Sequence, residues 1–420
     1  MKEAWDIAVI GGGASGLAAA ISAKQAAREL SVLLLEKKEK PGKKLSVTGN
    51  GRCNLSNTGC AQREPVTDFF RTAGITVREE EDGRLYPYNE DAQEVAAVLT
   101  EHARRLGVRI ITNCEVQSVE AIQTGGFHLF AQGKIKGKNG SDSENMRIKA
   151  GKVLIATGGK SYGVFGSTGD GYRFARALGH AVAAPVPALT AIDTAQDLTK
   201  LKGIRAKAQV RLLHLDRVCM QESGEVQFRA DGLSGICIMN LSGHLRLDRS
   251  DGRSLREQFG DYRLVLDLTP EFEQKELLEC FQRHYALYDC CAADLLRTLV
   301  KLPLAEEILR RAGIEPKAPA ARLSRAQLES LADVLKRFSL TVCGTKGWNE
   351  AQVTAGGVRE SQVNGQTMES QIVPGLYFAG EVLEYAGPCG GYNLHHAWLT
   401  GILAGTAMAE AACRNRAGTL

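Results

Sequence analysis

The sequence lacks any long apolar run. No stretch reaches the roughly 18–20 consecutive apolar residues that a membrane-spanning helix needs. The N-terminus, MKEAWDIAVIGGG, also lacks the longer apolar region of a secretion signal, because acidic residues and a glycine turn interrupt it. We therefore expect a soluble cytoplasmic protein with no membrane partner.

Regular cysteine spacing and a strong charge of either sign are missing as well. The eleven cysteines are an odd number, and none forms a CxxC pair or a cysteine–histidine cluster with zinc-ligand spacing. Reduced thiols are expected, with no complete disulfide framework and no metal site. The 52 basic and 48 acidic side chains leave a formal net charge of +4, which is too small to indicate a nucleic-acid partner by itself.

What is present indicates a globular protein of more than one domain. Apolar residues make up 44% of the chain and charged residues 24%. A length of 420 residues is too long for one ordinary core, so about two or three domains are expected.

Three glycines near the N-terminus form a GxGxxG pattern. Gly11, Gly13 and Gly16 stand between an apolar run at 7–10 and an alanine-rich run at 18–27, and Glu36 closes the next apolar run. This order predicts a strand, a helix and a second strand, with a pyrophosphate at the helix N-terminus and a ribose at the carboxylate. The pattern leaves open whether the dinucleotide is NAD, NADP or FAD, and a purely structural turn is the alternative.

The middle of the chain differs in pattern from both ends. Two prolines break the pattern near 184–187, short β-like runs follow over 190–268, and helical patterns follow near 270–288, 292–312 and 324–338. We predict an α/β fold with a discontinuous Rossmann-like domain at 1–189 and 341–420, an inserted β-rich domain at 190–268, and a helical subdomain at 269–340. Three domains in series are the alternative.

The C-terminal segment 373–398 carries a second nucleotide-binding signal. A strand, GLYFA, ends at Gly380 and Glu381, and Gly390 and Gly391 lead into a long helix that begins near Asn393. The positive end of that helix could stabilise negative charge on the N1–C2=O edge of a reduced flavin. Glycines that serve turn geometry alone are the alternative.

These motifs resemble a known group of flavoproteins. GGGASG with Glu36, ATGG at 156–159 and GLYFAGE at 375–381 resemble the three FAD-binding segments of two-dinucleotide-binding-domain flavoproteins. More narrowly, the chain resembles the BaiN-like or aminoacetone oxidase-like family of bacterial NAD(P)/FAD-dependent oxidoreductases. The blocks that carry this narrower resemblance lie at 41–57, 165–180, 232–243, 354–358 and 368–398.

The resemblance implies that FAD binds the discontinuous domain. Its pyrophosphate would lie over residues 11–16, its adenosine ribose at Glu36, its adenine at the backbone of Val116, and its ribityl region at Glu381. Residues 391–394 would lie beside the pyrimidine end of the ring. The full expected cofactor-binding set is Gly11, Gly13, Ala14, Ser15, Gly16, Glu36, Lys37, Lys43, Lys44, Gly51, Arg52, Cys53, Asn54, Val116, Thr157, Gly158, Gly159, Gly380, Glu381, Gly391, Tyr392, Asn393 and Leu394.

The sequence identifies no firm catalytic residue. Cys53, Asn54 and Tyr392 are weak candidates. A thiol beside cationic groups can act as an acid or nucleophile, but a packing role for Cys53 and a loop-fixing role for Asn54 are favoured. His395 and His396 open the final helix, where a capping or packing role is favoured over proton transfer. Tyr162 and Tyr392 are each a candidate for a ring contact or an ordinary loop aromatic.

The function that we predict is that of a FAD-dependent oxidoreductase. It would transfer a hydride between a small organic substrate and FAD, with NAD(P)H or oxygen left open as the redox partner. A flavin-containing RNA-binding or tRNA-modifying protein is the alternative, and a plain NAD-dependent dehydrogenase is a third possibility. A basic run could attract RNA or an anionic substrate, although a solvated strand face is favoured. The run consists of Lys200, Lys202, Arg205, Lys207 and Arg211.

Overall fold

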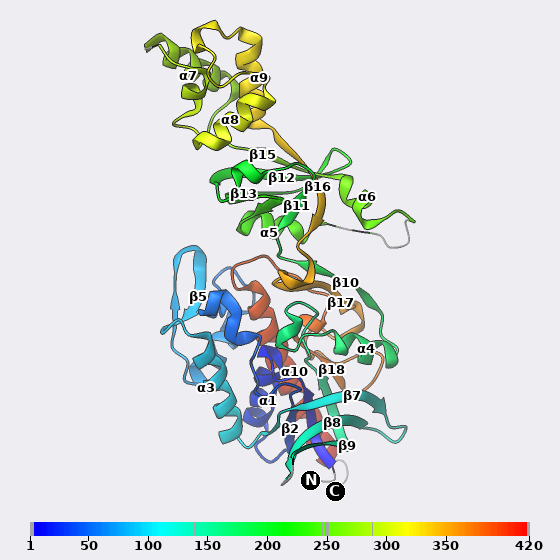
Figure 1. Cartoon of the computed structure of the whole chain (residues 1–420). Helices are drawn as coiled ribbons and strands as arrows, with labels where there is room; N and C mark the ends of the chain where they lie inside the picture. The colour runs from blue at the N-terminus through cyan, green and yellow to red at the C-terminus, as the bar shows by residue number, and fades with distance from the viewer. Residues whose placement is uncertain (1–3, 138–139, 246, 248–251, 288, 418–420) are drawn as a thin grey trace. The chain divides into compact units, whose positions relative to one another are not determined.

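The computed structural model describes residues 4–137, 140–245, 247, 252–287 and 289–417 (Figure 1). The chain divides into two compact units. The first contains Met1–Pro187 and Gln352–Leu420, and the second contains Ala188–Ala351. Each unit has its own apolar core, and the two cores share no residue.

A parallel sheet forms the centre of the first unit. Its parallel strands are β6 (Arg109–Ile111), β2 (Val32–Leu35), β1 (Ala4–Ile10), β9 (Gly140–Ile155) and β18 (Leu376–Phe378). Two antiparallel strands, β8 (Phe127–Gly137) and β7 (Cys114–Ala121), extend the sheet from β9. All four residues of β2 are buried, as expected for a strand that is covered on both faces.

The register aligns the carboxyl ends of the central strands at one edge of the sheet. Ile10 pairs with both Leu35 and Ile155, and Ile155 pairs with Phe378. The segments after β1, β2, β9 and β18 therefore leave from the same edge. In open parallel sheets this is the edge where ligands bind.

Two helices far apart in the sequence pack against each other on this sheet. They are α1 (Ala14–Ala26), drawn in blue in Figure 1, and α10 (Tyr392–Ala417), drawn in red. Close approach depends on glycine, because a Cβ at Gly401 would lie 2.4 Å from the Ser15 carbonyl oxygen and one at Gly405 would lie 2.2 Å from that of Ala19.

Smaller elements complete the first unit. They are the helices α2 (Arg63–Thr72), α3 (Ala92–Arg105) and α4 (Asp170–Ala177), a sheet of β3 (Ser56–Asn57), β5 (Arg84–Pro87) and β4 (Val77–Glu79), and a ribbon of β10 (Val182–Ala188) and β17 (Val353–Val358). In the described part of the chain no helix is long and apolar enough to cross a bilayer.

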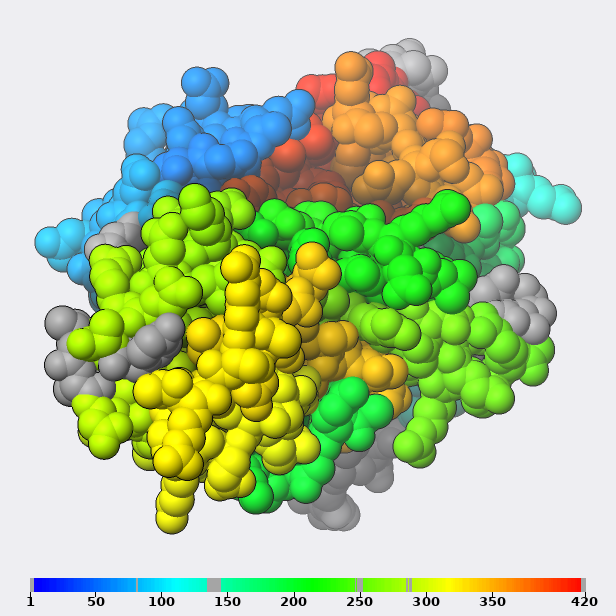
Figure 2. Space-filling model, turned by 90° about the horizontal axis from the view of Figure 1, so that it is seen from above, coloured from blue at the N-terminus to red at the C-terminus, as the bar shows by residue number. Residues whose placement is uncertain are grey.

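The second unit is built on a closed antiparallel barrel. Its strands, in barrel order, are β11 (Ile192–Thr194), β14 (Gly232–Ser234), β13 (Arg217–Arg229), β12 (Arg205–His214), β15 (Tyr262–Asp267) and β16 (Phe338–Thr345). Helices α5 (Ile236–Ser242) and α6 (Leu255–Gly260) lie between β14 and β15 in the chain. A helical segment of α7 (Gln274–Leu287), α8 (Leu302–Arg311) and α9 (Arg325–Lys336) follows β15; its later part is the yellow surface in Figure 2.

The predicted fold class is confirmed, but the structure differs from the predicted boundary at 340/341 and from the single helix predicted over 292–312. The boundary at 340/341 falls within β16, whose residues Phe338, Leu340 and Val342 are buried and complete the barrel. The helical segment is therefore inserted between two barrel strands and does not follow a finished β domain. The helix expected over 292–312 is broken into a short 3₁₀ turn at Ala292–Leu296 and helix α8, which begins at Leu302. Pro303 lies in the first turn of α8 and lacks the N–H that would continue a helix from the preceding residues.

Candidate functional site

The turn between β1 and α1 has the geometry of an anion-binding helix N-terminus. Gly11 has φ +104°, and a Cβ there would lie 2.4 Å from the Ala156 carbonyl oxygen. A Cβ at Gly16 would lie 1.9 Å from the Gly11 carbonyl oxygen. Gly13, by contrast, has no neighbouring atom within 4 Å of such a Cβ, and it caps α1 without a side-chain hydrogen bond. Two glycines thus serve close packing, whereas the third faces open space.

Glu36 lies beside this turn at the end of β2. Its carboxylate accepts hydrogen bonds from the backbone N–H of Gly12 at 2.8 Å and of Lys38 at 2.7 Å. Burial raises the pKa of the Glu36 carboxyl, and the two N–H donors oppose that shift. Each carboxylate oxygen keeps acceptor capacity for a further donor such as a ribose hydroxyl.

A polar network links the segments after β2, β9 and β18 with Thr354 of β17. Glu381 accepts from Lys44 Nζ at 2.6 Å, from Ser161 Oγ at 2.8 Å and from the backbone N–H of Thr354 at 2.7 Å. Lys44 Nζ also donates to Ser161 Oγ at 2.8 Å. A Cβ at Gly159 would lie 2.3 Å from Thr354 Oγ1, so the ATGG turn also belongs to this network.

The loop at 49–54 meets the start of α10. Gly391 has φ +102°, and a Cβ there would lie 2.3 Å from the Ser56 carbonyl oxygen and 2.8 Å from Asn54 Oδ1. Asn54 Oδ1 is buried and has no hydrogen-bond partner within the described residues. The structure therefore brings together two segments that the sequence assigned to the flavin.

Several expected cofactor contacts have side chains that are engaged elsewhere. Lys37 pairs with Asp170 at 2.5 Å, and Lys43 pairs with Glu39 at 2.9 Å. Arg52 binds Glu80 and Glu90, and the Tyr392 hydroxyl lies 3.5 Å from Asn57 Oδ1. The side-chain amide of Asn393 binds the Gly387 N–H and carbonyl and the Pro388 carbonyl. Val116, whose backbone was expected at the adenine, is a residue of β7 with a buried side chain.

Cys53 is placed as a packing residue. It is fully buried, and burial raises the pKa of its thiol to about 12, so the neutral thiol is present near pH 7. This environment favours the packing role over that of a nucleophile.

The two histidines of α10 have different partners. His395 bridges Ser56 Oγ at 2.8 Å and the Ala61 carbonyl oxygen at 2.9 Å, so it ties the helix to β3. His396 stacks on Tyr385 with ring centroids 3.9 Å apart. Burial lowers the pKa of His396 to about 4, and its Nε2 is buried without a hydrogen-bond partner within the described residues.

The sequence predictions omitted three residues that build the site. Ser161 and Thr354 complete the Glu381 network, and Ser56 holds His395. Ser161 follows the ATGG turn by two residues and Thr354 opens the TAGGV block, so both lay next to motifs that the sequence singled out. Ser56 lies within the block at 41–57, but the sequence did not indicate its pairing with His395, which belongs to a distant helix.

Comparison with protein families shows to which family the chain belongs. The model of the HI0933-like protein Rossmann domain matches residues 5–65 and 60–407. The chain belongs to this HI0933-like family. It is a FAD-dependent oxidoreductase, as the sequence predicted.

Individual relatives of this HI0933-like protein have different names. A 3-dehydro-bile acid delta(4,6)-reductase from Clostridium scindens is 34% identical over 96% of this chain and 99% of its own length. A ribosomal RNA dihydrouridine synthase from Escherichia coli is 28% identical over 94% of this chain and 96% of its own length. The solved structure of a 3-ketosteroid-delta4-(5alpha)-dehydrogenase from Rhodococcus jostii is 16% identical, with 97% of each chain covered and a TM-score of 0.47.

Proposed function

We propose that this HI0933-like protein reduces a carbon–carbon double bond conjugated to a carbonyl group in a small organic substrate. The observation that carries the proposal is the 34% identity to the Clostridium scindens reductase over 99% of that relative. Its name describes reduction of double bonds in a 3-oxo compound. Formation of dihydrouridine likewise saturates a double bond conjugated to a carbonyl, so both relatives' names describe the same reaction class.

The residues at the carboxyl edge of the sheet fit a flavin dinucleotide. Open space over Gly13 and an uncapped α1 suit a pyrophosphate, which the helix N-terminus and its N–H groups would hold. Thr157 Oγ1 and Asn54 Oδ1 are buried polar atoms with no partner within the described residues, and both lie in segments of this edge. Buried polar atoms normally have partners, so these two atoms are consistent with a site for a polar group.

We assign the chain's own residues to orienting the cofactor and controlling charge. Glu36 would accept from the adenosine ribose, and Lys44, Ser161 and Glu381 would fix the segments beside the ribityl chain. Bound FAD supplies the hydride through N5 of its ring. The N-terminus of α10, a helix of 26 residues, would stabilise negative charge at the pyrimidine edge.

Anaerobic absorbance measurements test this function. We expect NADH or NADPH to bleach the flavin of the purified protein, and an unsaturated 3-oxo steroid acid to restore its absorbance without air. Reoxidation by that compound at a rate no faster than by its saturated counterpart would contradict the proposal. Adding aminoacetone to oxidised enzyme tests the opposite direction, because bleaching would identify an amine oxidase.

A second candidate function, action on RNA, rests on the 28% identity to the Escherichia coli dihydrouridine synthase. The basic run gives this candidate little support. Arg205 pairs with Glu225 at 3.1 Å, and Lys207 lies opposite the same glutamate in the β12–β13 register, so acidic side chains offset part of the charge. A gel shift with ribosomal RNA at low salt tests the candidate, since RNA binding through phosphates weakens steeply as salt rises.

A further inference from the structure

The loop that carries Asn54 has an unfavourable backbone. Gly49, Asn50, Gly51 and Cys53 all have positive φ, at +58°, +56°, +87° and +61°. For Asn50 and Cys53, which have a Cβ, this left-handed region is disfavoured, so other contacts must hold the loop in place.

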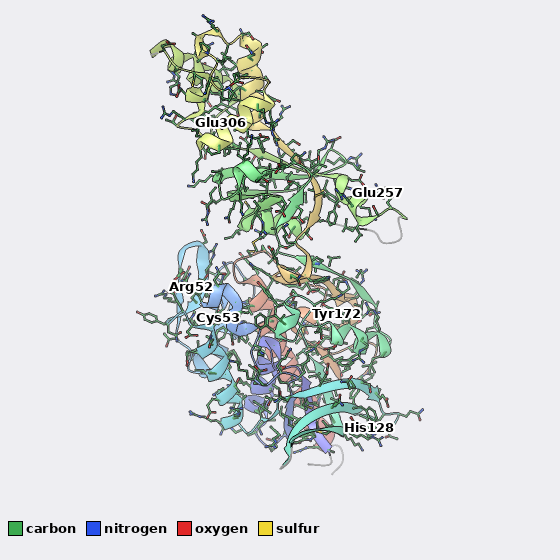
Figure 3. All side chains as sticks on the ribbon, viewed as in Figure 1. Arg52, Cys53, His128, Tyr172, Glu257 and Glu306 are labelled. Atoms are coloured by element: carbon green, nitrogen blue, oxygen red, sulfur yellow. The ribbon has the colours of Figure 1, made fainter. Side chains whose placement is uncertain are left out.

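Arg52 supplies those contacts. Its Nη2 donates to Glu80 at 2.7 Å, its Nε donates to Glu90, and its guanidinium lies 4.2 Å from the centre of the Tyr86 ring. Figure 3 labels Arg52 next to Cys53 in the first unit. The planar guanidinium thus binds two carboxylates and an aromatic face, and all three partners lie outside the loop.

This loop ends where the flavin ring is assigned. Asn54 is the last residue of this loop. Its Oδ1 atom faces Gly391 at the start of α10 and has no hydrogen-bond partner in the described structure. A shift of the loop would therefore move Asn54 relative to the helix N-terminus. The Nε and Nη2 groups of Arg52 instead donate to Glu90 and Glu80, so its guanidinium is held by partners outside the loop.

We propose that Arg52 is a positioning residue that holds Asn54 against the N-terminus of α10 and thereby sets how the flavin ring is bound. The proposal rests on the cofactor assignment made under the proposed function. It replaces the direct cofactor contact that the sequence predicted for Arg52 with an action through the loop.

Arg78 provides a matched control within the same charge network. It donates to Glu80 at 3.1 Å, pairs with Glu90, and lies near the Tyr88 ring, but it belongs to β4 and not to the loop. Arg52→Gln and Arg78→Gln each remove one positive charge from the same two glutamates. Only the first removes the link between the network and the loop.

The experiment compares the two variants as FAD-loaded proteins. We expect Arg52→Gln to weaken FAD binding about tenfold, to change the visible flavin absorption, and to increase hydrogen exchange at 49–55. Arg78→Gln should leave FAD affinity within about twofold of the parent, as expected for partly exposed ion pairs. Equal effects of both variants, or an unchanged flavin spectrum in Arg52→Gln, would overturn the proposal.

Arg52→Lys tests the geometry in a protein that keeps the charge. A single ammonium cannot bind both glutamates and stack on Tyr86 as the guanidinium does, so we expect an intermediate FAD affinity. Full recovery by lysine would show that charge alone matters and would contradict the positioning role. A parent protein that binds FAD but reduces no conjugated double bond would sink the proposed function and leave this comparison intact.

Discussion

At the scale of single residues, the site is built from charges that already have protein partners. Glu381 and Lys44 are each about four-fifths buried, with exposed side-chain fractions of 19% and 21%, and Ser161 and Thr354 complete the network. A buried charge that loses its partner is strongly destabilising, whereas removal of both charges costs less. In this network, removal of one charge should therefore destabilise the protein more than removal of both charges together.

Lys44→Met is expected to lower the free energy of unfolding by about 2–3 kcal/mol, because Glu381 then lacks its ion-pair partner. Adding Glu381→Gln to this variant should restore part of the loss. Lys43→Met is the control, because its partner Glu39 keeps 57% of its side chain exposed and can be hydrated when the pair is lost. This variant should lose much less stability than Lys44→Met. Urea unfolding of the parent, the two single network variants, their double variant and Lys43→Met measures these energies. Strict additivity of Lys44→Met and Glu381→Gln would contradict the coupling.

His396 should make stability depend on pH. Burial lowers its pKa from 6.5 to about 4, so the unfolded chain binds a proton between these values and the folded chain does not. The stability that the neutral His396 gives is fully present above about pH 6.5. As the pH falls toward 4, the free energy of unfolding should drop by up to about 3 kcal/mol. His396→Phe keeps a ring on Tyr385 but cannot be protonated. Between pH 7 and pH 4.5 the free energy of unfolding of this variant should fall less than that of the parent. An equal dependence on pH in both proteins would contradict the assignment of this pH effect to His396.

The position of a residue in the fold could be predicted where a motif is local. Gly11, Gly16 and Glu36 act within one strand–helix–strand unit, so their spacing determines their placement. Side-chain partners across the fold could not be predicted in this way. Lys37 binds Asp170 and Arg52 binds Glu80, and nothing in the neighbouring sequence indicates either pairing.

At the scale of elements, helix α1 combines tight packing with an open N-terminus. Its face toward α10 is closed by glycine contacts, and its first turn faces space that holds no protein atom near Gly13. Substitutions in the same motif should therefore separate folding from cofactor binding.

We expect Gly16→Ala to destabilise the protein by about 3 kcal/mol or more, because its Cβ would overlap the Gly11 carbonyl. Gly13→Ala should cost less than about 1 kcal/mol in stability. It should still weaken FAD binding about tenfold, since its methyl group enters the space over the helix N-terminus. Thermal unfolding and FAD fluorescence titration separate the two effects. Unchanged FAD affinity in Gly13→Ala would argue against a pyrophosphate at this position.

Element boundaries were predicted less well than element types. The helical pattern near 324–338 and the strand at β16 adjoin without a glycine or proline, so the sequence offered no signal for the change at Phe338. Closure of the barrel depends on pairing between β16 and β11, which is a contact between distant segments. Local patterns do not carry that information.

At the scale of the whole molecule, the second unit is an insertion with adjacent ends. The backbone N–H of Arg359, just after β17, donates to the carbonyl of Ala181, just before β10. Because this bond places the end of β17 at the start of β10, the two paired strands run in opposite directions, and Ala188 and Val353 lie at the same end of their ribbon. All of the residues assigned to FAD belong to the first unit.

Replacing 189–351 by a short glycine–serine turn should therefore leave a chain that folds and binds FAD. We expect a bound-flavin absorption spectrum and one cooperative thermal transition, because the core of the first unit contains no residue of the insertion. The segment 188–351, produced alone, should also unfold cooperatively. A shortened chain that is soluble but colourless after incubation with FAD would contradict the assignment of the cofactor to the first unit.

The pairing of β18 with β9 also dictates the order of events during synthesis. Leu376 lies beside Val153 in the sheet, yet the ribosome must release the whole second unit before Leu376 appears. Until α10 follows, the face of α1 that packs against Gly401 and Gly405 has no cover, and the flavin site lacks one of its two helix N-termini. We expect the inserted unit to fold first and FAD to be captured only near the end of translation, which makes the nascent first unit a client for chaperones.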